Sequence, residues 1–347
     1  MEVQKDIKVL VVDDSPVSRQ VLIHILESDA RIHVIGEAKN GLEALSWLKN
    51  HQVDVVTMDI FMPGLDGFET SREIMEKHPI PIAIISGAYS DLDTQKAFKA
   101  MEAGALAILP KPAAPSRPPF EKEAQEIIKI VKTIAEVKVV TRRKYLKLNH
   151  EVPLPKGNIP KNVQAIAIGA SLGGPVAIAQ ILTSLQKGFP VPIFIVQHIS
   201  PGFTQGFVNW LKQNTALNVE VAKEGVQALP GNIYIAPDKC HMEIKPNHLI
   251  ALDFTPTQGI QPSVSRLFHS MASTYGPKGL GIILTGMGKD GTSELLLMKQ
   301  KGAYTIAQSE EGCLMFGMPK EAIRIGAASA VMSLNQIATT LSSWNKK

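Results

Sequence analysis

Three polar residues in the second half of the chain each follow an apolar run with the length of a buried strand. These residues are Ser171, His198 and Asp290. Each follows its apolar run directly or after a short turn. The carboxyl ends of parallel strands meet at one edge of a sheet, so the three side chains can converge in one crevice. A serine, a histidine and an aspartate that meet in this way can carry out acyl transfer as nucleophile, base and orienting group.

The serine lies in residues 169–173, whose sequence Gly-Ala-Ser-Leu-Gly fits the pattern G-x-S-x-G. Its glycines permit a tight strand-to-helix turn that presents the hydroxyl. Such a turn is also typical of helix packing or of a phosphate bound at a helix N-terminus. His198 occupies the next strand end, where a dinucleotide site needs an acidic residue, which weakens that alternative. The order Ser, His, Asp also differs from the order in α/β-hydrolases, so that fold is not inferred.

His198 and Asp290 each have a structural alternative. A single histidine can be a core residue with satisfied hydrogen bonds, and Asp290 can cap the helix that follows it. The position of His198 before the loop at residues 199–203 favours a functional role, because a general base must reach the nucleophile from such a loop.

A second group of polar residues closes the strands expected in the first third of the chain. Asp13 and Asp14 follow the first strand and Asp59 follows the third. Three adjacent carboxylates repel one another unless a cation neutralises them, and oxygen ligands suit Mg²⁺. Ser86 and Lys111 close the fourth and fifth strands, and such groups hold the oxygens of a phosphoryl group. Each residue alone could be a cap, turn or loop residue, but five at successive strand ends favour a site.

Strand-like and helix-like segments alternate in both halves, which predicts an α/β fold with two domains. The first is expected to be a doubly wound, five-stranded domain at residues 1–137. Its expected strands, with a last helix at Phe120–Val137, are Lys8–Val12, Val34–Ala38, Val53–Met58, Ile82–Ile85 and Ala107–Leu109. Charges, prolines and glycine at residues 138–160 indicate a linker.

Residues 161–347 are expected to form the second domain, an α/β unit with a parallel sheet. Its expected strands are Ala165–Ile168, Ile193–Gln197, Val219–Ala222, Ile233–Ile235, Gly281–Leu284 and Tyr304–Ala307. The stretch His241–Asp253, with a Pro-Asn turn, predicts a hairpin at the edge of that sheet.

The composition of the 347 residues excludes several classes of protein. The net charge of +4, without a basic stripe interleaved with aromatics, argues against a dedicated nucleic-acid binder, and the basic residues 142–144 are expected to be solvated linker. No apolar run reaches the roughly 18 residues of a membrane span, and the N-terminus is too charged for a signal peptide, so a cytoplasmic location is expected. Cys240 and Cys313 lack the paired spacing of a zinc site and are expected to be reduced thiols.

The first third of the chain resembles the response-regulator receiver domain. The segments that carry the resemblance are Val11–Ser15, Met58–Gly67, Ile85–Ala88 and Pro110–Pro112. The resemblance implies that Asp59 accepts a phosphoryl group and that Ser86 and Lys111 contact it. It also implies a Mg²⁺ ion held by Asp13, Asp14, Asp59 and the carbonyl of Phe61. Ile108 stands where receivers usually carry an aromatic switch residue, so their usual rotamer-coupled readout is not implied.

Most of the second half resembles the catalytic domain of the chemotaxis protein-glutamate methylesterases, the CheB family. The matching segments are Ile168–Pro175, Val196–Thr204, Tyr234–Pro237, Pro262–Val264, Leu284–Gly291 and Ala307–Pro319. The resemblance implies that Ser171 is the nucleophile, His198 the general base and acid, and Asp290 the group that orients the imidazole. Main-chain amides of Leu172 and Met287 are the candidates for the oxyanion site. No cofactor is implied in this domain. Leu172 replaces a threonine that is usual in the family.

Together the resemblances imply a phosphorylation-activated enzyme that hydrolyses glutamate γ-methyl esters and deamidates glutamines on methyl-accepting chemotaxis receptors. The phosphodonor would be a chemotaxis histidine kinase, and neither nucleic acid nor insertion into a membrane is implied. One alternative is a receiver-controlled scaffold that binds receptor helices without turnover, which Leu172 and Ile108 leave open. A transcription regulator is disfavoured because no helix-turn-helix pattern follows the receiver.

Overall fold

The chain forms two compact units, which a computed structural model describes separately. The units are residues 1–150 and 151–347. The described residues are 5–87, 91–115, 117–137, 139, 160, 162–257 and 259–345. The expected linker, except for residues 139 and 160, and its basic residues 142–144 therefore lie outside the described residues.

The first unit contains a parallel sheet of five strands. In chain order the strands are β1 (Ile7–Val12), β2 (Ile32–Ala38), β3 (Val55–Met58), β4 (Ile82–Ser86) and β5 (Ala107–Pro110). They lie in the order β2-β1-β3-β4-β5, and every pair is parallel. The strand order reverses between β1 and β3, so their carboxyl ends flank the crevice where ligands bind in such sheets. The predicted five-stranded, doubly wound domain is confirmed.

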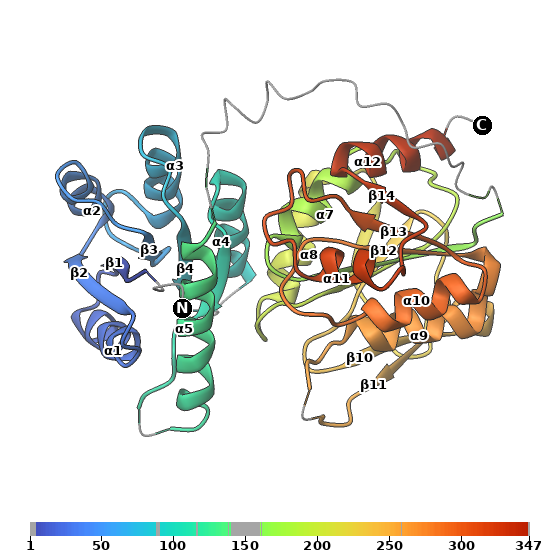
Figure 1. Cartoon of the computed structure of the whole chain (residues 1–347), viewed down its shortest axis with the longest axis horizontal. Helices are drawn as coiled ribbons and strands as arrows, with labels where there is room; N and C mark the ends of the chain where they lie inside the picture. Colours follow the sequence, from blue (N-terminus) through green and yellow to red (C-terminus); the bar gives the residue numbers. More distant parts are fainter. Residues whose placement is uncertain are drawn as a thin grey trace. The chain divides into compact units, whose positions relative to one another are not determined.

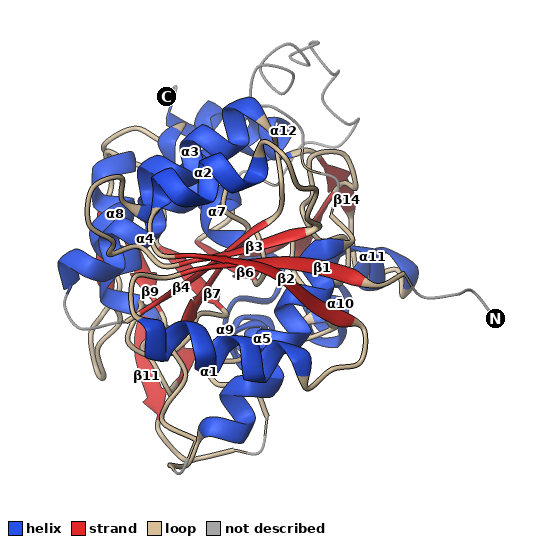
Figure 2. Cartoon of the chain, turned by 90° about the vertical axis from the view of Figure 1, so that its left-hand side faces the viewer, coloured by secondary structure: helices blue, strands red, loops and turns tan. Residues whose placement is uncertain are grey.

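Helices cover both faces of this sheet (Figure 2). One face carries α1 (Pro16–Glu27) and α5 (Phe120–Ala135), and the other carries α2 (Gly41–Leu48), α3 (Gly67–Lys77) and α4 (Asp91–Ala103). Because β3 and β4 are buried on both faces, all of their residues are buried, and most are apolar, without the alternation of a half-exposed strand. Helix α5 ends two residues before the predicted boundary at Val137.

The second unit, drawn from yellow-green to red in Figure 1, contains a parallel sheet of seven strands. In chain order they are β6 (Ala165–Ala170), β7 (Ile193–Gln197), β8 (Asn218–Val221), β9 (Asn232–Ile235), β12 (Gly279–Ile283), β13 (Tyr304–Gln308) and β14 (Ala330–Met332). Their spatial order is β14-β13-β12-β6-β7-β9-β8. The predicted parallel sheet is confirmed. Strand β14 is missing from the prediction because three residues at a sheet edge, only one of them buried, give no periodic signal.

Two groups of helices pack on this sheet, and a hairpin packs against one of them. One group is α7 (Gly174–Thr183), α8 (Thr204–Asn214) and α12 (Leu334–Ser342), and the other is α9 (Val264–Tyr275), α10 (Thr292–Gln300) and α11 (Met318–Arg324). Short 3₁₀ turns occupy Pro246–His248, Gly276–Lys278 and Ser343–Asn345. The hairpin of β10 (His241–Lys245) and β11 (Leu249–Asp253) forms as predicted.

The predicted place of that hairpin, at the edge of the main sheet, is wrong. Strands β10 and β11 form a separate two-stranded sheet, and β10 packs against α9. The buried side chains of Met242, Ile244 and Ile250 point into the core shared with α9. Main-chain hydrogen bonds join His248 and Ile250 to residues 225–228, outside the strands of the main sheet. Cys240 and Cys313 are both free thiols. In the part of the chain that the structure describes, no helix combines the length and apolarity of a membrane span.

The start of helix α12 provides a test of the described fold. The Ser333 hydroxyl accepts a hydrogen bond from the N–H of Gln336, and the Gln336 side chain accepts one from the N–H of Ser333. Because this capping box satisfies donors that the helix leaves unpaired, Ser333→Ala should lower the free energy of unfolding by about 1 kcal/mol. Denaturant unfolding measures it. The exposed Ser343→Ala is the control at the other helix end, and equal effects of both substitutions would contradict the capping role.

Candidate functional site

The adjacent strands β7, β6 and β12 bring the first group of polar residues to one edge of the second sheet. Ala170 pairs in register with Gln197, so Ser171 and His198 follow at the same level of neighbouring strands. The N–H of His198 donates to the carbonyl of Ala170 at 2.9 Å, and the N–H of Ser171 donates to the carbonyl of Thr285 at 3.0 Å. The parallel ladder therefore continues into the site and fixes the main chain of both residues.

Glycines shape the turn that carries Ser171. Gly173 has a φ of +78°, a left-handed conformation that favours glycine. Gly286, in the loop after β12, lies so close that a Cβ there would be 2.7 Å from the Cβ of Ser171. Among the described residues, no hydrogen bond from the Leu172 amide is found, so this N–H is available to a ligand. Met287 directly follows Gly286 on the neighbouring strand end.

The carboxylate of Asp290 is the most heavily bonded group of the site. Its Oδ2 lies 2.8 Å from Nε2 of His198 and accepts from the N–H of Val264 at 2.6 Å. Its Oδ1 accepts from the Ser263 hydroxyl at 2.8 Å and from the Ser265 N–H at 3.1 Å. Three of these donors lie at the start of α9, so the carboxylate faces the positive end of that helix.

The alternative role considered for Asp290 was a cap of the helix that follows it. Helix α10 has no side-chain cap, because its N-cap residue is Gly291. Asp290 instead accepts hydrogen bonds at the start of α9, which precedes it in the chain. The sequence did not reveal this arrangement, since the contact joins segments 25 residues apart or more. The only local signal was a serine directly before the apolar helix start at Val264.

The surroundings of Asp290 keep its carboxyl group ionised. Burial opposes ionisation, but the hydrogen bond and charge of His198 and the hydrogen bonds from Ser263 and Ser265 hold the pKa of Asp290 well below its usual range. An ionised carboxylate only accepts hydrogen bonds, so the shared proton belongs to Nε2 of His198. Nδ1 is then the ring nitrogen that can take a proton from Ser171. No hydrogen bond joins Ser171 to the imidazole within the described residues, and such bonds often form only with substrate.

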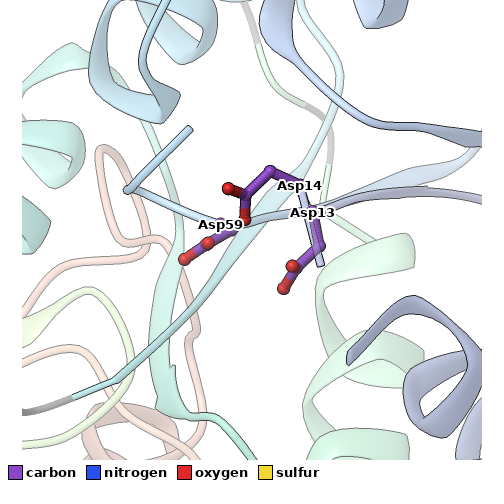
Figure 3. A group of neighbouring side chains, drawn as sticks. All are labelled: Asp13, Asp14 and Asp59. Atoms are coloured by element: carbon purple, nitrogen blue, oxygen red, sulfur yellow. The ribbon is translucent and has the colours of Figure 1, made fainter. Parts of the chain in front are cut away.

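The second group of polar residues lies at the carboxyl ends of β1, β3, β4 and β5 in the first unit. Carboxylate oxygens of Asp13, Asp14 and Asp59 lie within 4.8 Å of one another (Figure 3). Nζ of Lys111 lies 2.7 Å from Oδ2 of Asp13 and 2.9 Å from Oδ2 of Asp59. The hydroxyl of Ser86 is buried and has no hydrogen-bond partner among the described residues. All five residues named from the sequence thus lie at one edge of the sheet.

This acidic cluster fits a divalent cation. Burial and the charge of Asp13 raise the pKa of Asp59 against the opposing effect of Lys111. The two buried carboxylates and the exposed Asp14 supply hard oxygen ligands, and exposure on one side leaves room for water, as Mg²⁺ requires. Phe61, whose carbonyl is the fourth candidate ligand, follows β3 at the same edge.

Comparisons with known proteins give consistent results for both units. A family model described as CheB methylesterase matches residues 166–341, and one described as response regulator receiver domain matches residues 9–117. The protein-glutamate methylesterase/protein-glutamine glutaminase of Nitrosospira multiformis is 46% identical over 340 residues, which cover 96% of each chain. A similarly named protein of Syntrophus aciditrophicus is 44% identical over 343 residues, which cover 96% of this chain and 97% of its own.

A solved structure resembles the second unit. The crystal structure of the Thermotoga maritima CheB methylesterase catalytic domain has a TM-score of 0.50 and 36% identity, and the match covers 52% of this chain and 98% of that one. The two resemblances inferred from the sequence motifs are confirmed by these matches.

The repulsion within the acidic cluster can be tested by its effect on the stability of the protein. Neutralising Asp59 removes a buried charge, so Asp59→Asn should stabilise the metal-free first unit at pH 7 by on the order of 1 kcal/mol. The gain should shrink as the pH falls through the raised pKa of Asp59, because the wild-type carboxyl then becomes neutral as well. Calorimetry over a pH series measures the unfolding temperatures.

Asp54 provides a control, because its substitution should change the unfolding temperature in the opposite direction. Burial alone would raise the pKa of Asp54, but hydrogen bonds from Lys5 and the Lys8 N–H lower it, so Asp54→Asn should destabilise the same unit. If Asp59→Asn lowered the unfolding temperature of the metal-free protein as Asp54→Asn does, the proposed repulsion in the acidic cluster would be contradicted.

Proposed function

The chain belongs to the CheB family of protein-glutamate methylesterases/protein-glutamine glutaminases, and from that membership we propose that it is a phosphorylation-activated esterase and deamidase of methyl-accepting chemotaxis receptors. The His198–Asp290 hydrogen bond beside the Ser171 turn is the observation that carries this proposal. The proposed organisation is a receiver domain at residues 1–137, a linker at residues 138–160 and a catalytic domain at residues 161–347.

The first proposed step acylates Ser171. Its Oγ attacks the γ-carbonyl of a glutamate methyl ester while Nδ1 of His198 takes the hydroxyl proton. The negative charge on the carbonyl oxygen is met by the amide of Leu172, with the Met287 amide as the second candidate donor. Asp290 stabilises the imidazolium, which then gives its proton to the departing methoxide. Methanol leaves, and the glutamyl group remains bound to Ser171 as an ester.

The second proposed step restores the enzyme. Water gives a proton to Nδ1 of His198 and attacks the acyl carbonyl, and the tetrahedral intermediate collapses to a free glutamate and a serine that recovers its proton. A glutamine side chain would follow the same route with ammonia as the leaving group. Leu172 serves this chemistry through its main chain, so the absence of the usual threonine removes a hydroxyl but no amide donor.

The receiver domain is proposed to control this reaction. A histidine kinase would transfer a phosphoryl group to Asp59, with Lys111 and the unpaired hydroxyl of Ser86 placed to hold its oxygens. Asp13, Asp14, Asp59 and the Phe61 carbonyl would hold Mg²⁺, which neutralises the crowded negative charge when it is bound. The receptor substrate and the kinase imply a cytoplasmic location. Ile108, a half-buried residue of β5, leaves this receiver without the usual aromatic switch.

Methanol release from a methylated receptor cytoplasmic fragment tests the proposed function. We expect slow release by the full chain, faster release with Mg²⁺ and a small phosphodonor, and none from Ser171→Ala. Asp59→Ala should keep the slow release and lose the stimulation, since it lacks the phosphoacceptor. Equal stimulation of Asp59→Ala would refute the regulatory assignment. Binding of the fragment without any release would favour the alternative of a scaffold without turnover.

The role of Asp290 has its own test. In Asp290→Asn the uncharged amide no longer stabilises an imidazolium, so kcat for methanol release should fall by on the order of 10³–10⁴-fold. Asp253→Asn is the matched control, because Asp253 forms an ion pair with Arg266 at the surface and should be nearly neutral for kcat. Similar rates in the two variants would contradict the proposed role of Asp290.

A further inference from the structure

Gln197, the last residue of β7, lies where β6 and β7 separate. Its side chain is buried, with 5% of the residue exposed. The side-chain Nε2 donates one hydrogen bond to the carbonyl of Ser171 and one to the carbonyl of His198, each at 2.8 Å. A single amide group therefore joins the main chains of the proposed nucleophile and the proposed base.

The topology explains why carbonyls at this point need donors from outside the strand ladder. The last bond between β6 and β7 runs from the N–H of His198 to the carbonyl of Ala170, and beyond it one strand turns into α7 while the other enters the loop at residues 199–203. Buried main-chain carbonyls beyond a ladder are costly unless another group donates to them. The Ser171 carbonyl also accepts a hydrogen bond from the N–H of Gly174. The His198 carbonyl accepts its hydrogen bond from the side-chain amide of Gln197.

The amide oxygen of Gln197 indicates that this residue is not there for stability alone. Its Oε1 is buried and accepts no hydrogen bond among the described residues. It lies against Gly174, where a Cβ would overlap it. Rotating the amide by 180° would direct Oε1 at two carbonyl oxygens, so the orientation is fixed by the two donor bonds. An unsatisfied buried acceptor is costly, and an apolar residue would fill the same space without that cost.

We propose that Gln197 is a positioning residue that holds the main chains of Ser171 and His198 at the separation that proton transfer requires. It does not touch the substrate and acts through the two residues whose carbonyls it binds. This inference rests on the proposed function of Ser171 and His198. A positioning role predicts a loss in kcat without a change in KM, because substrate binding does not involve Gln197.

Gln197→Met in the full chain tests this inference by methanol release from a methylated receptor fragment. Methionine has a similar length and no donor, so we expect kcat to fall about 100-fold with an unchanged KM, as when catalytic groups are slightly misplaced. Thr305→Val is the matched control. The Thr305 hydroxyl is buried on β13 of the same sheet and donates to the Ala327 carbonyl at 2.6 Å, away from Ser171 and His198. It should lower the unfolding temperature and leave kcat close to the wild-type value.

Gln197→Leu is the second variant in case methionine prevents folding. Its side chain is apolar and donates no hydrogen bond, so the same loss of kcat at unchanged KM is expected. The inference is overturned if kcat of the folded variants stays close to the wild-type value while their unfolding temperatures fall as in Thr305→Val, or if only KM changes. Absence of release from the wild-type chain would overturn the proposed function and this inference together.

Discussion

The four hydrogen bonds to the carboxylate of Asp290 are the interaction on which the proposed catalytic site depends. They join the loop after β12, the start of α9 and the imidazole of His198, which come from three separate parts of the chain. Because three donors at the start of α9 share this carboxylate, its position and its charge are set before any substrate binds. A neutral His198 ring facing this ionised carboxylate carries its proton on Nε2. Its Nδ1 is then available to the proposed nucleophile, Ser171.

Both units use the same property of parallel sheets for different chemistry. In the first unit, strand ends collect carboxylates, an ammonium and a hydroxyl suited to a metal and a phosphoryl group. In the second, they collect a serine, a histidine and an aspartate suited to acyl transfer. Strand register sets the level of residues that directly follow a strand, such as Ser171 and His198 after the paired Ala170 and Gln197. The loops and buried amides determine the positions of the others.

The sequence predicted the residues at the strand ends well, because buried parallel strands are continuous apolar runs and a polar residue marks where each run stops. It did not predict what lies around them. The contacts of Ser263 and Ser265 with Asp290, and the contact of Gln197 with two carbonyls, depend on how loops far apart in the sequence fold against each other. The hairpin was predicted but was wrongly placed at the edge of the main sheet, since apolar alternation reveals a buried face and not the partner that covers it.

The most direct test of this account is the tautomer of His198 in the full-length chain, measured by nitrogen-15 NMR with histidine labelling and assigned with His198→Ala. We predict that neutral His198 carries its proton on Nε2, that this proton is shifted downfield by the bond to Asp290, and that Nδ1 is unprotonated. A neutral ring protonated on Nδ1 would contradict the account, because no nitrogen would then be available to accept the proton of Ser171 while Asp290 holds the other.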